Sequence, residues 1–202
     1  MQQEQLLRTT VIWVAILNFS YFILEGIVAL TIGSVSLFAD SVDFFEDFAV
    51  NTLIAIALGF SLRTRAIIGK IMSGIILLPA IAALVQAIIK FSHPTAPDPL
   101  RLMITAGGAI VINTVCVLLL ARCRNEGGSL SIAAFLAARN DIAANAAIII
   151  MGIVTYYTLS GWPDIIVGLC ITALNYSAAK EVWEAATSES LKARALAGED
   201  ID

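Results

Sequence analysis

The segment ADSVDFFED places four carboxyl side chains inside an otherwise apolar stretch. Asp40, Asp43, Glu46 and Asp47 lie within eight residues, between the runs SVSLF and FAVNTLIAIAL. On a helix, the three aspartates share a face about 80° wide with Asn51. Glu46 lies about 60° beyond Asp43, at the edge of that face. Because a carboxylate inside a membrane costs a few kcal/mol, such a stripe predicts cation binding, proton sharing or a wet cavity.

A second set of polar residues lies near the N-terminus. Asn18, Tyr21 and Glu25 follow a spacing that places them on one face of a helix. They could line the same cavity or only form hydrogen bonds between helices. Glu25 is expected nearer the outer half of the membrane, so access or proton exchange suits it better than the central site.

The segment AAFLAARNDIAANAAIIIMGIV holds a third set. Asp141 and Asn145 are four residues apart on one face, with Ala137 one turn earlier. Asn140 is turned about 100° from Asp141, and Arg139 about 160°. Asp141 is therefore expected to meet the acidic stripe and complete an oxygen-rich site of the kind that harder divalent cations prefer, whereas imidazole favours zinc-like metals. Alternatively, the acids pair with a basic residue, for which Arg139 is the main candidate.

The elements that position these residues are predicted to be membrane-spanning helices. Of the 202 residues, 59% are hydrophobic and 14% charged, against about 45–50% and about 25% in soluble domains. Six apolar runs reach the roughly 20 residues that a spanning helix needs: about 10–32, 35–60, 67–91, 102–121, 130–159 and 164–183. The fold class is therefore an all-α membrane protein, a six-transmembrane-helix bundle with one domain over residues 1–202.

The distribution of basic residues predicts the orientation. If the N-terminus is inside, the outer segments hold only Lys90 and Arg101. The inner segments hold Arg8, Arg63, Arg65, Lys70, Arg122, Arg124, Lys180, Lys192 and Arg194. This bias predicts cytoplasmic N- and C-termini.

Several function classes are excluded or disfavoured. Without a basic stripe interleaved with aromatics, nucleic-acid binding is not expected. No nucleophile, base and orienting group converge, so an enzyme and a cofactor are not expected. Cys116, Cys123 and Cys170 lack metal-ligand spacing and are interpreted as small hydrophobic residues. His93 is expected at the surface of an outer loop. The polar start MQQEQLLRTT gives no sign of a cleaved signal peptide.

At this point the chain resembles a known family. GSVSLFADSVDFFED is similar to the second-helix signature of the cation diffusion facilitators: a Ser-rich start, a Leu-Ala-Asp-like element, then His-or-Asp, three residues and Asp. The element ends here at Asp40, and the metal pair matches Asp43 and Asp47. The family's fifth-helix motif matches ARND at its end, which places its second half on Asp141.

The resemblance implies an exporter of divalent metals that alternates access, exchanges metal for protons and forms a homodimer in the cell (inner) membrane. Metal would bind midway through the membrane between the second and fifth helices, on Asp43, Asp47 and Asp141. Protons and metal would compete for the same carboxylates, which gives the exchange a physical basis.

The chain departs from the family pattern in three places. Ala137 stands where the first fifth-helix ligand is expected, so Asn145, Asn51, Asn140 or water would supply the missing contact, with Asp40 and Glu25 on the access path or proton relay. RCRNEGGS lacks the His-rich tract of some zinc members. No C-terminal cytoplasmic domain is expected within 202 residues. Zinc, cadmium or cobalt follows from the resemblance, and manganese or iron competes because the site lacks imidazole.

Two other functions stay open. The first is a cation-conducting pore, or a proton-coupled carrier of another class, whose acids never form a closed metal site. The second is a non-transporting membrane subunit that uses its polar faces only for helix packing.

Overall fold

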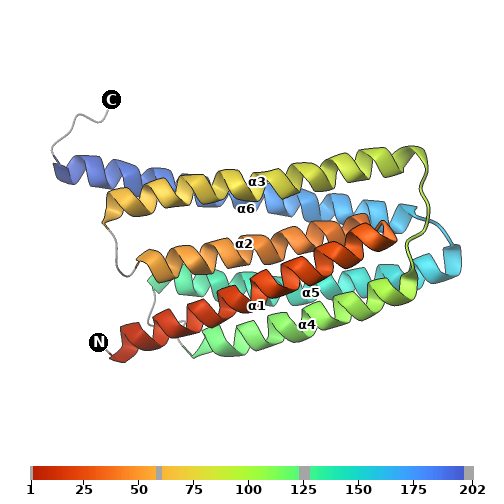
Figure 1. Cartoon of the computed structure of the whole chain (residues 1–202), viewed down its shortest axis with the longest axis horizontal. Helices are drawn as coiled ribbons and strands as arrows, with labels where there is room; N and C mark the ends of the chain where they lie inside the picture. The colour runs from red at the N-terminus through yellow and green to blue at the C-terminus, as the bar shows by residue number, and fades with distance from the viewer. Residues whose placement is uncertain (1, 58–60, 123–127, 198–202) are drawn as a thin grey trace.

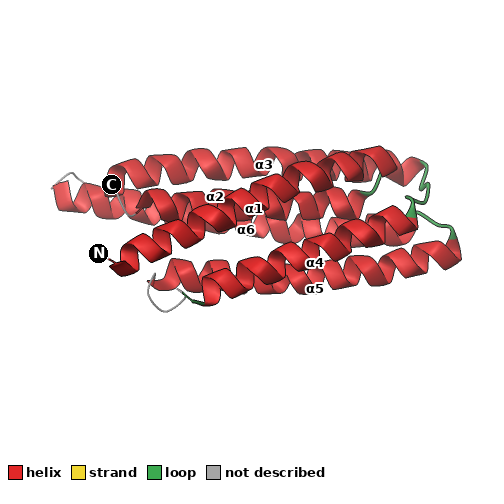
Figure 2. Ribbon diagram, turned by 60° about the horizontal axis from the view of Figure 1, so that its bottom comes forward, coloured by secondary structure: helices red, strands yellow, loops and turns green. Residues whose placement is uncertain are grey.

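The described chain is helical, as its composition predicted. The computed structural model describes residues 2–57, 61–122 and 128–197, which form helices joined by short connections, with no strand among them (Figure 2). In chain order the helices are α1 (Gln2–Ile32), α2 (Val35–Ala57), α3 (Leu62–Ser92), α4 (Pro99–Ala121), α5 (Gly128–Thr158) and α6 (Trp162–Ala197). Several extend beyond the predicted apolar runs, and the predicted end of the second span, at 58–60, lies outside the described residues.

Local sequence signals set the helix ends. The α1–α2 turn contains Gly33 with φ 66°, a left-handed conformation that glycine adopts without steric cost. Asp98 caps α4, because its side chain accepts from the backbone N–H groups of Leu100 at 3.0 Å and Arg101 at 3.1 Å. Pro99 fills the first position of α4, where no N–H is needed. Such short turns place consecutive helices antiparallel.

Helix α2 is the most central element of the bundle. It packs against α1, α3, α5 and α6, whereas α3 pairs mainly with α6, and α4 mainly with α5. Figure 1 shows the start of α1 and the end of α6 at one end of the bundle. The α1–α2 turn, the end of α3 and the start of α6 lie at the opposite end. The helix that carries the four acids is therefore enclosed by other helices.

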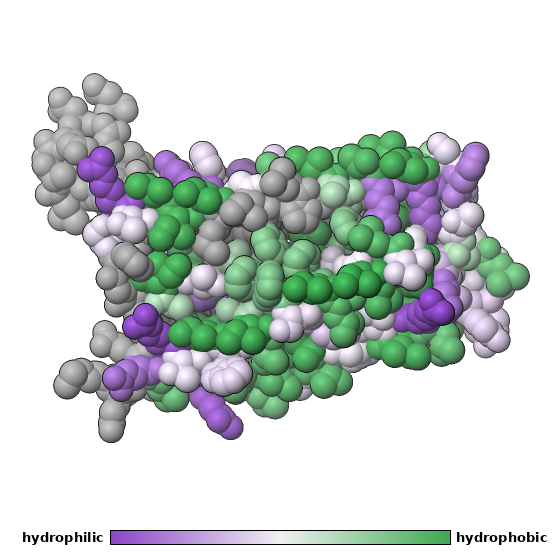
Figure 3. Space-filling view, viewed as in Figure 1, coloured by the Kyte–Doolittle hydropathy of each residue, from purple (hydrophilic) through white to green (hydrophobic). Residues whose placement is uncertain are grey.

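The surface has the character of a membrane protein. Apolar residues cover the middle of the face in Figure 3, and hydrophilic residues gather toward its ends. Ile27, Ile89 and Ile104 are 61%, 70% and 66% exposed, which suits a lipid-facing surface. Within the described residues, three segments are long and apolar enough to cross a membrane: Gln5–Ile32, Pro99–Ala121 and Ala137–Thr158. The count of six spans stays a prediction.

Candidate metal centre

An aromatic contact sets the rotation of α2. Three ring pairs join α1 to α2, with centroids 4.9, 5.0 and 4.8 Å apart: Tyr21–Phe44, Phe22–Phe45 and Phe19–Phe48. On a helix Phe45 and Phe48 lie roughly opposite Asp43, about 160° and about 140° away, whereas Phe44 is turned about 100° from it. Since the rings are held against α1, the acidic stripe is turned toward the other neighbours of α2.

The acidic stripe of α2 is inside the bundle. The side chains of Asp40 and Asn51 are fully buried, Asp47 is 7% exposed, and Asp43 is half-buried. Asn51 donates from Nδ2 to the backbone carbonyl of Asp47 at 2.8 Å. Glu46 is half-buried at the edge of the stripe. The stripe predicted from the sequence therefore follows one interior face of α2.

Helix α5 faces this stripe. Asp141 is half-buried and lies near enough to Asp43 and Asp47 to interact with them as like charges. Asn145 is fully buried and donates from Nδ2 to Asp40 Oδ1 at 3.1 Å and to the carbonyl of Asp141 at 3.0 Å. Asn145 thereby ties α5 to α2 one turn away from Asp141.

The remaining predicted residues divide between the interior and the surface. Ala137 is half-buried one turn before Asp141, whereas Asn140 is exposed on α5 and does not join the carboxyls. His93 is exposed at the C-terminal end of α3. Among the residues that the structure describes, no three His, Cys, Asp or Glu side chains are grouped closely enough to hold a metal ion. Asp43, Asp47 and Asp141 thus face one another without forming a closed ligand cluster.

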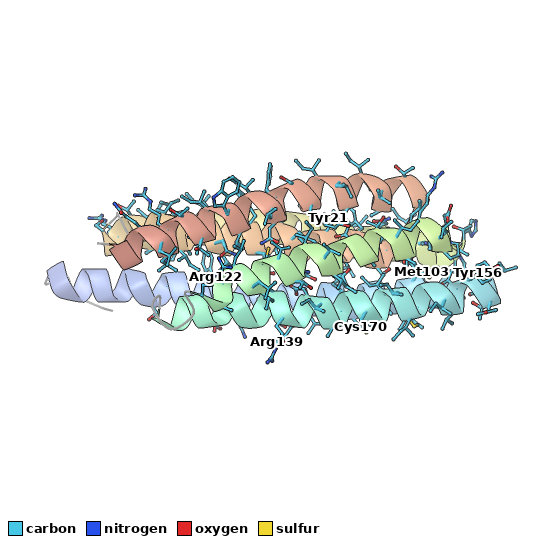
Figure 4. The ribbon with its side chains drawn as sticks, turned by 90° about the horizontal axis from the view of Figure 1, so that it is seen from below. Tyr21, Met103, Arg122, Arg139, Tyr156 and Cys170 are labelled. Atoms are coloured by element: carbon cyan, nitrogen blue, oxygen red, sulfur yellow. The ribbon has the colours of Figure 1, made fainter. Side chains whose placement is uncertain are left out.

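No basic side chain neutralises these carboxyls within the described part of the chain. Asp43, Asp47 and Asp141 form no ion pair there, and Arg139 is exposed and points away from the bundle (Figure 4). The helical spacing had turned Arg139 away from Asp141, and the structure agrees. A group of unpaired carboxyls in a bundle interior can bind a cation or hold protons.

Glu25 lies beside the stripe. It is fully buried, and neither of its carboxyl oxygens has a hydrogen-bond donor among the described residues. Its nearest acidic neighbour is Asp40, close enough for the two carboxyls to share a proton. Asn18 is also fully buried on α1, and Tyr21 donates its hydroxyl to the carbonyl of Thr105 at 2.6 Å. The polar face of α1 therefore places Asn18 and Glu25 in the bundle interior, and it contacts α4 through the Tyr21 hydroxyl.

Sequence reasoning missed Asn113 of α4 and interpreted Cys116, also on α4, as a small hydrophobic residue, which agrees with its place in a buried apolar cluster. Asn113 is 1% exposed, and neither polar atom of its side chain has a partner in the described chain. Cys116 is fully buried, its Sγ lies 3.9 Å from Asn18 Oδ1, and it is near enough to Asp47 and Asp141 to sense their charges. Asn113 and Cys116 are three residues apart, a spacing that could have indicated a polar face on α4.

Comparison with protein-family models identifies the family of the chain. Residues 11–188 match the family model described as the cation efflux transmembrane domain. No curated protein matches the chain. The matched range begins in α1, ends in α6 and includes every candidate ligand. Because the match covers most of the chain, the protein belongs to the cation efflux family, the cation diffusion facilitators, which are membrane cation transporters and not enzymes.

Proposed function

We propose that the chain exports a divalent metal cation by alternating access, exchanging metal for protons, with the metal bound mid-membrane between α2 and α5. One observation carries this proposal. Carboxyls from two helices, Asp43 and Asp47 on α2 and Asp141 on α5, face each other in the bundle interior, and no described basic residue pairs with them. Such carboxyls can bind a cation or hold protons.

The chemistry of the site follows from its oxygen atoms. A divalent cation would require the three carboxyls ionised and would draw them together, since its charge offsets their mutual repulsion. Protons would compete for the same oxygens and release the cation, which couples the two fluxes. Asn145 and Asn51 are weaker candidates for metal ligands than the three carboxyls, because the amide nitrogen of each already donates to a nearby oxygen.

Metal identity belongs to the proposal as well. Zinc, cadmium or cobalt follows from the family. Manganese or iron is favoured by a site with carboxylates and amides but no imidazole, because oxygen ligands suit harder cations. Transport assays with each of these metals, at equal concentration and pH, would order them by initial rate.

We further propose six spans in one transmembrane domain, cytoplasmic termini and an inner-membrane location. The common end of the bundle at which α1 starts and α6 ends supports an even number of crossings (Figure 1). A homodimer is expected. Mass measurement in nanodiscs tests it, and a uniform monomer would count against the dimer.

The deciding experiment uses purified protein in liposomes that contain a metal-sensitive dye. Metal flux should depend on an imposed pH gradient and should be lost in Asp47→Ala. Asp98→Asn is the matched control, because Asp98 is an exposed acid whose contacts are the cap of α4 and an exposed ion pair with Arg101. Equal flux in wild type and Asp47→Ala would remove the ligand assignment.

A cation-conducting pore is the second candidate. It is favoured by the absence of a closed three-residue ligand cluster among the described side chains. A pore would give a current driven by membrane potential, with little selection among metals and no dependence on a proton gradient. A saturable flux that stops when the proton gradient collapses would exclude it.

A further inference from the structure

A carboxylate of α6 caps a different helix. Asp164, in the first turn of α6, is fully buried and accepts hydrogen bonds from residues at the start of α2. From Ser34 it accepts the hydroxyl at 2.6 Å, and from Val35 the backbone N–H at 2.9 Å. From Ser36 it accepts both the backbone N–H at 3.1 Å and the hydroxyl at 2.6 Å. The two backbone N–H groups, of Val35 and Ser36, are among those that a helix start leaves without an intrahelical partner.

A lysine of α3 completes this arrangement. Lys90 Nζ lies 2.9 Å from Asp164 Oδ2, and the two side chains are 9% and 0% exposed. Lys90 also donates to the backbone carbonyl of Gly33. Ser34, Ser36, Lys90 and Asp164 are called the α2 clamp below. The α2 clamp joins the start of α2 to the α3–α6 pair through groups whose charges and hydrogen bonds are mutually satisfied.

Close packing surrounds the α2 clamp. Gly168 of α6 lies so near α2 that a Cβ on it would come 2.6 Å from Val35 Cγ1 and 2.8 Å from the backbone nitrogen of Ser36. Val35 also packs with Ala87 of α3 and Ile165 of α6 in one buried cluster. These residues belong to the start of α2, the last part of α3 and the start of α6, and these helix ends lie opposite the start of α1 (Figure 1). That end is therefore closed between α2, α3 and α6.

The two parts of α2 differ in how their polar groups are satisfied. The start of α2 is held by a fully paired carboxylate, whereas Asp43 and Asp47 further along have no ion pair within the described chain. Separating α2 from α6 at the clamp would keep the Lys90–Asp164 ion pair but would remove the four hydrogen bonds that Ser34, Val35 and Ser36 donate to the buried Asp164, which is costly. A gate requires a contact that can be made or broken, and the structure shows this contact made.

We propose that Asp164 is a positioning residue for transport: together with Lys90 it holds the start of α2 against α3 and α6, and release of the α2 clamp opens this end of the bundle to the carboxyls of α2 and α5. The inference rests on the proposed transport function. Asp164 touches no candidate ligand and acts through the position of α2. In the proposed orientation, this end faces the outside.

The native Cys116 provides a test, because it is buried and near Asp47 and Asp141. In a Cys123→Ala and Cys170→Ala background it is the only thiol. A membrane-impermeant thiol reagent, applied to either face of proteoliposomes of known orientation, measures access from each side. Asp164→Asn should raise labelling from the clamp side on the order of tenfold, the effect of losing one hydrogen bond to a charged group. Labelling from the opposite side, where α1 starts and α6 ends, should not rise. Metal flux should fall.

Two further variants define the contact. Ser36→Ala removes one hydroxyl but keeps the ion pair and the backbone N–H bonds, so it should fold and give a smaller rise on the same side. The double variant Lys90→Asp with Asp164→Lys restores the opposite charges. Lysine cannot accept hydrogen bonds, so the swap should not restore low labelling. Recovery in the swap would show that the ion pair alone closes this end and would overturn the capping role.

The controls separate a gate from a general loss of structure. Asp98→Asn removes the charge of an exposed acid at the same end but keeps an oxygen that can cap α4, and it should leave labelling unchanged. Each variant is checked by gel filtration and thermal unfolding. Unchanged clamp-side labelling in folded Asp164→Asn or Ser36→Ala, or an equal rise from both sides, overturns the inference. Absence of metal flux in the wild type would instead overturn the transport function.

Discussion

The acids of α2 differ in their contacts. Asp40 receives a hydrogen bond from Asn145, Asp43 is half-buried opposite Asp141, and the backbone carbonyl of Asp47 is bonded by Asn51. Asp40 is thus held within a polar contact between helices, whereas the hydrogen bonds among the described residues include no such donor to the carboxyls of Asp43 and Asp47. These contacts favour Asp43 and Asp47 as the proposed ligands, and they favour a structural or pathway role for Asp40.

The Asn145–Asp40 hydrogen bond makes a stability prediction. Asn145→Leu leaves the buried Asp40 Oδ1 without its donor and should lower the free energy of unfolding by about 1–3 kcal/mol. The double variant Asn145→Leu with Asp40→Leu should recover part of the loss, because both polar partners are gone. Unfolding of the wild type, Asn145→Leu, Asp40→Leu and the double variant in detergent gives the coupling energy. Additive losses would show that the two side chains do not interact.

Arg139 provides a test of the alternative in which the acids are only structural. Because its side chain is exposed and points away from the bundle, Arg139→Gln should leave metal flux within about twofold of wild type. Lys90→Met, which removes the partner of a fully buried acid, should reduce flux in the same liposome assay. A collapse of flux in Arg139→Gln would revive the interpretation that a basic residue pairs with the acidic stripe.

The sequence predicted those features of the site that depend only on the helical periodicity, namely which residues share a helix face. The 3.6-residue repeat placed Asp43 and Asp47 on one face and turned Arg139 away from Asp141, and the structure agrees on both points. It did not predict the bond between Lys90 and Asp164, because these residues are 74 positions apart and meet only when α3 and α6 pack together. Contacts of this kind depend on tertiary packing, which periodicity does not encode.

Among the helices, α2 makes two different packing contacts. Its aromatic side packs on α1, and its start fits closely against α6 through Gly168. Composition predicted α2 as a helix because the run is long and apolar apart from the acids. Its central position could not be predicted, since that depends on which helices pair.

The close approach at Gly168 gives an element-scale prediction. Gly168→Ala would place a Cβ 2.6 Å from Val35 Cγ1 and 2.8 Å from a backbone nitrogen, so α6 and α2 must shift apart. Thermal stability should fall and metal flux should drop. Gly107→Ala is the matched control, because no atom lies within 4 Å of its added Cβ. It should be neutral or slightly stabilising, since alanine favours helix by up to about 1 kcal/mol. Equal stability of the two variants would contradict the close α2–α6 contact.

At the scale of the whole molecule, the helix order and the basic residues support the same topology. Consecutive helices run in opposite directions, so the connections alternate between the two ends of the bundle (Figure 1). Apart from Arg124, which lies outside the described residues, the basic residues predicted to lie inside belong to helix segments toward the end that holds the start of α1. Exposed apolar side chains between the ends provide the lipid-facing surface.

This topology can be tested with two surface cysteines. Ser61, between α2 and α3, and His93, at the end of α3, are both exposed and lie at opposite ends of α3. In a background with all three native cysteines replaced by alanine, His93→Cys should react with an impermeant maleimide added outside intact cells. Ser61→Cys should react only after the membrane is opened, because its connection is predicted to be cytoplasmic. The reverse pattern would invert the orientation and turn the α2 clamp toward the cytoplasm. Labelling of both from outside would place both connections on one face, which a membrane-spanning α3 does not allow.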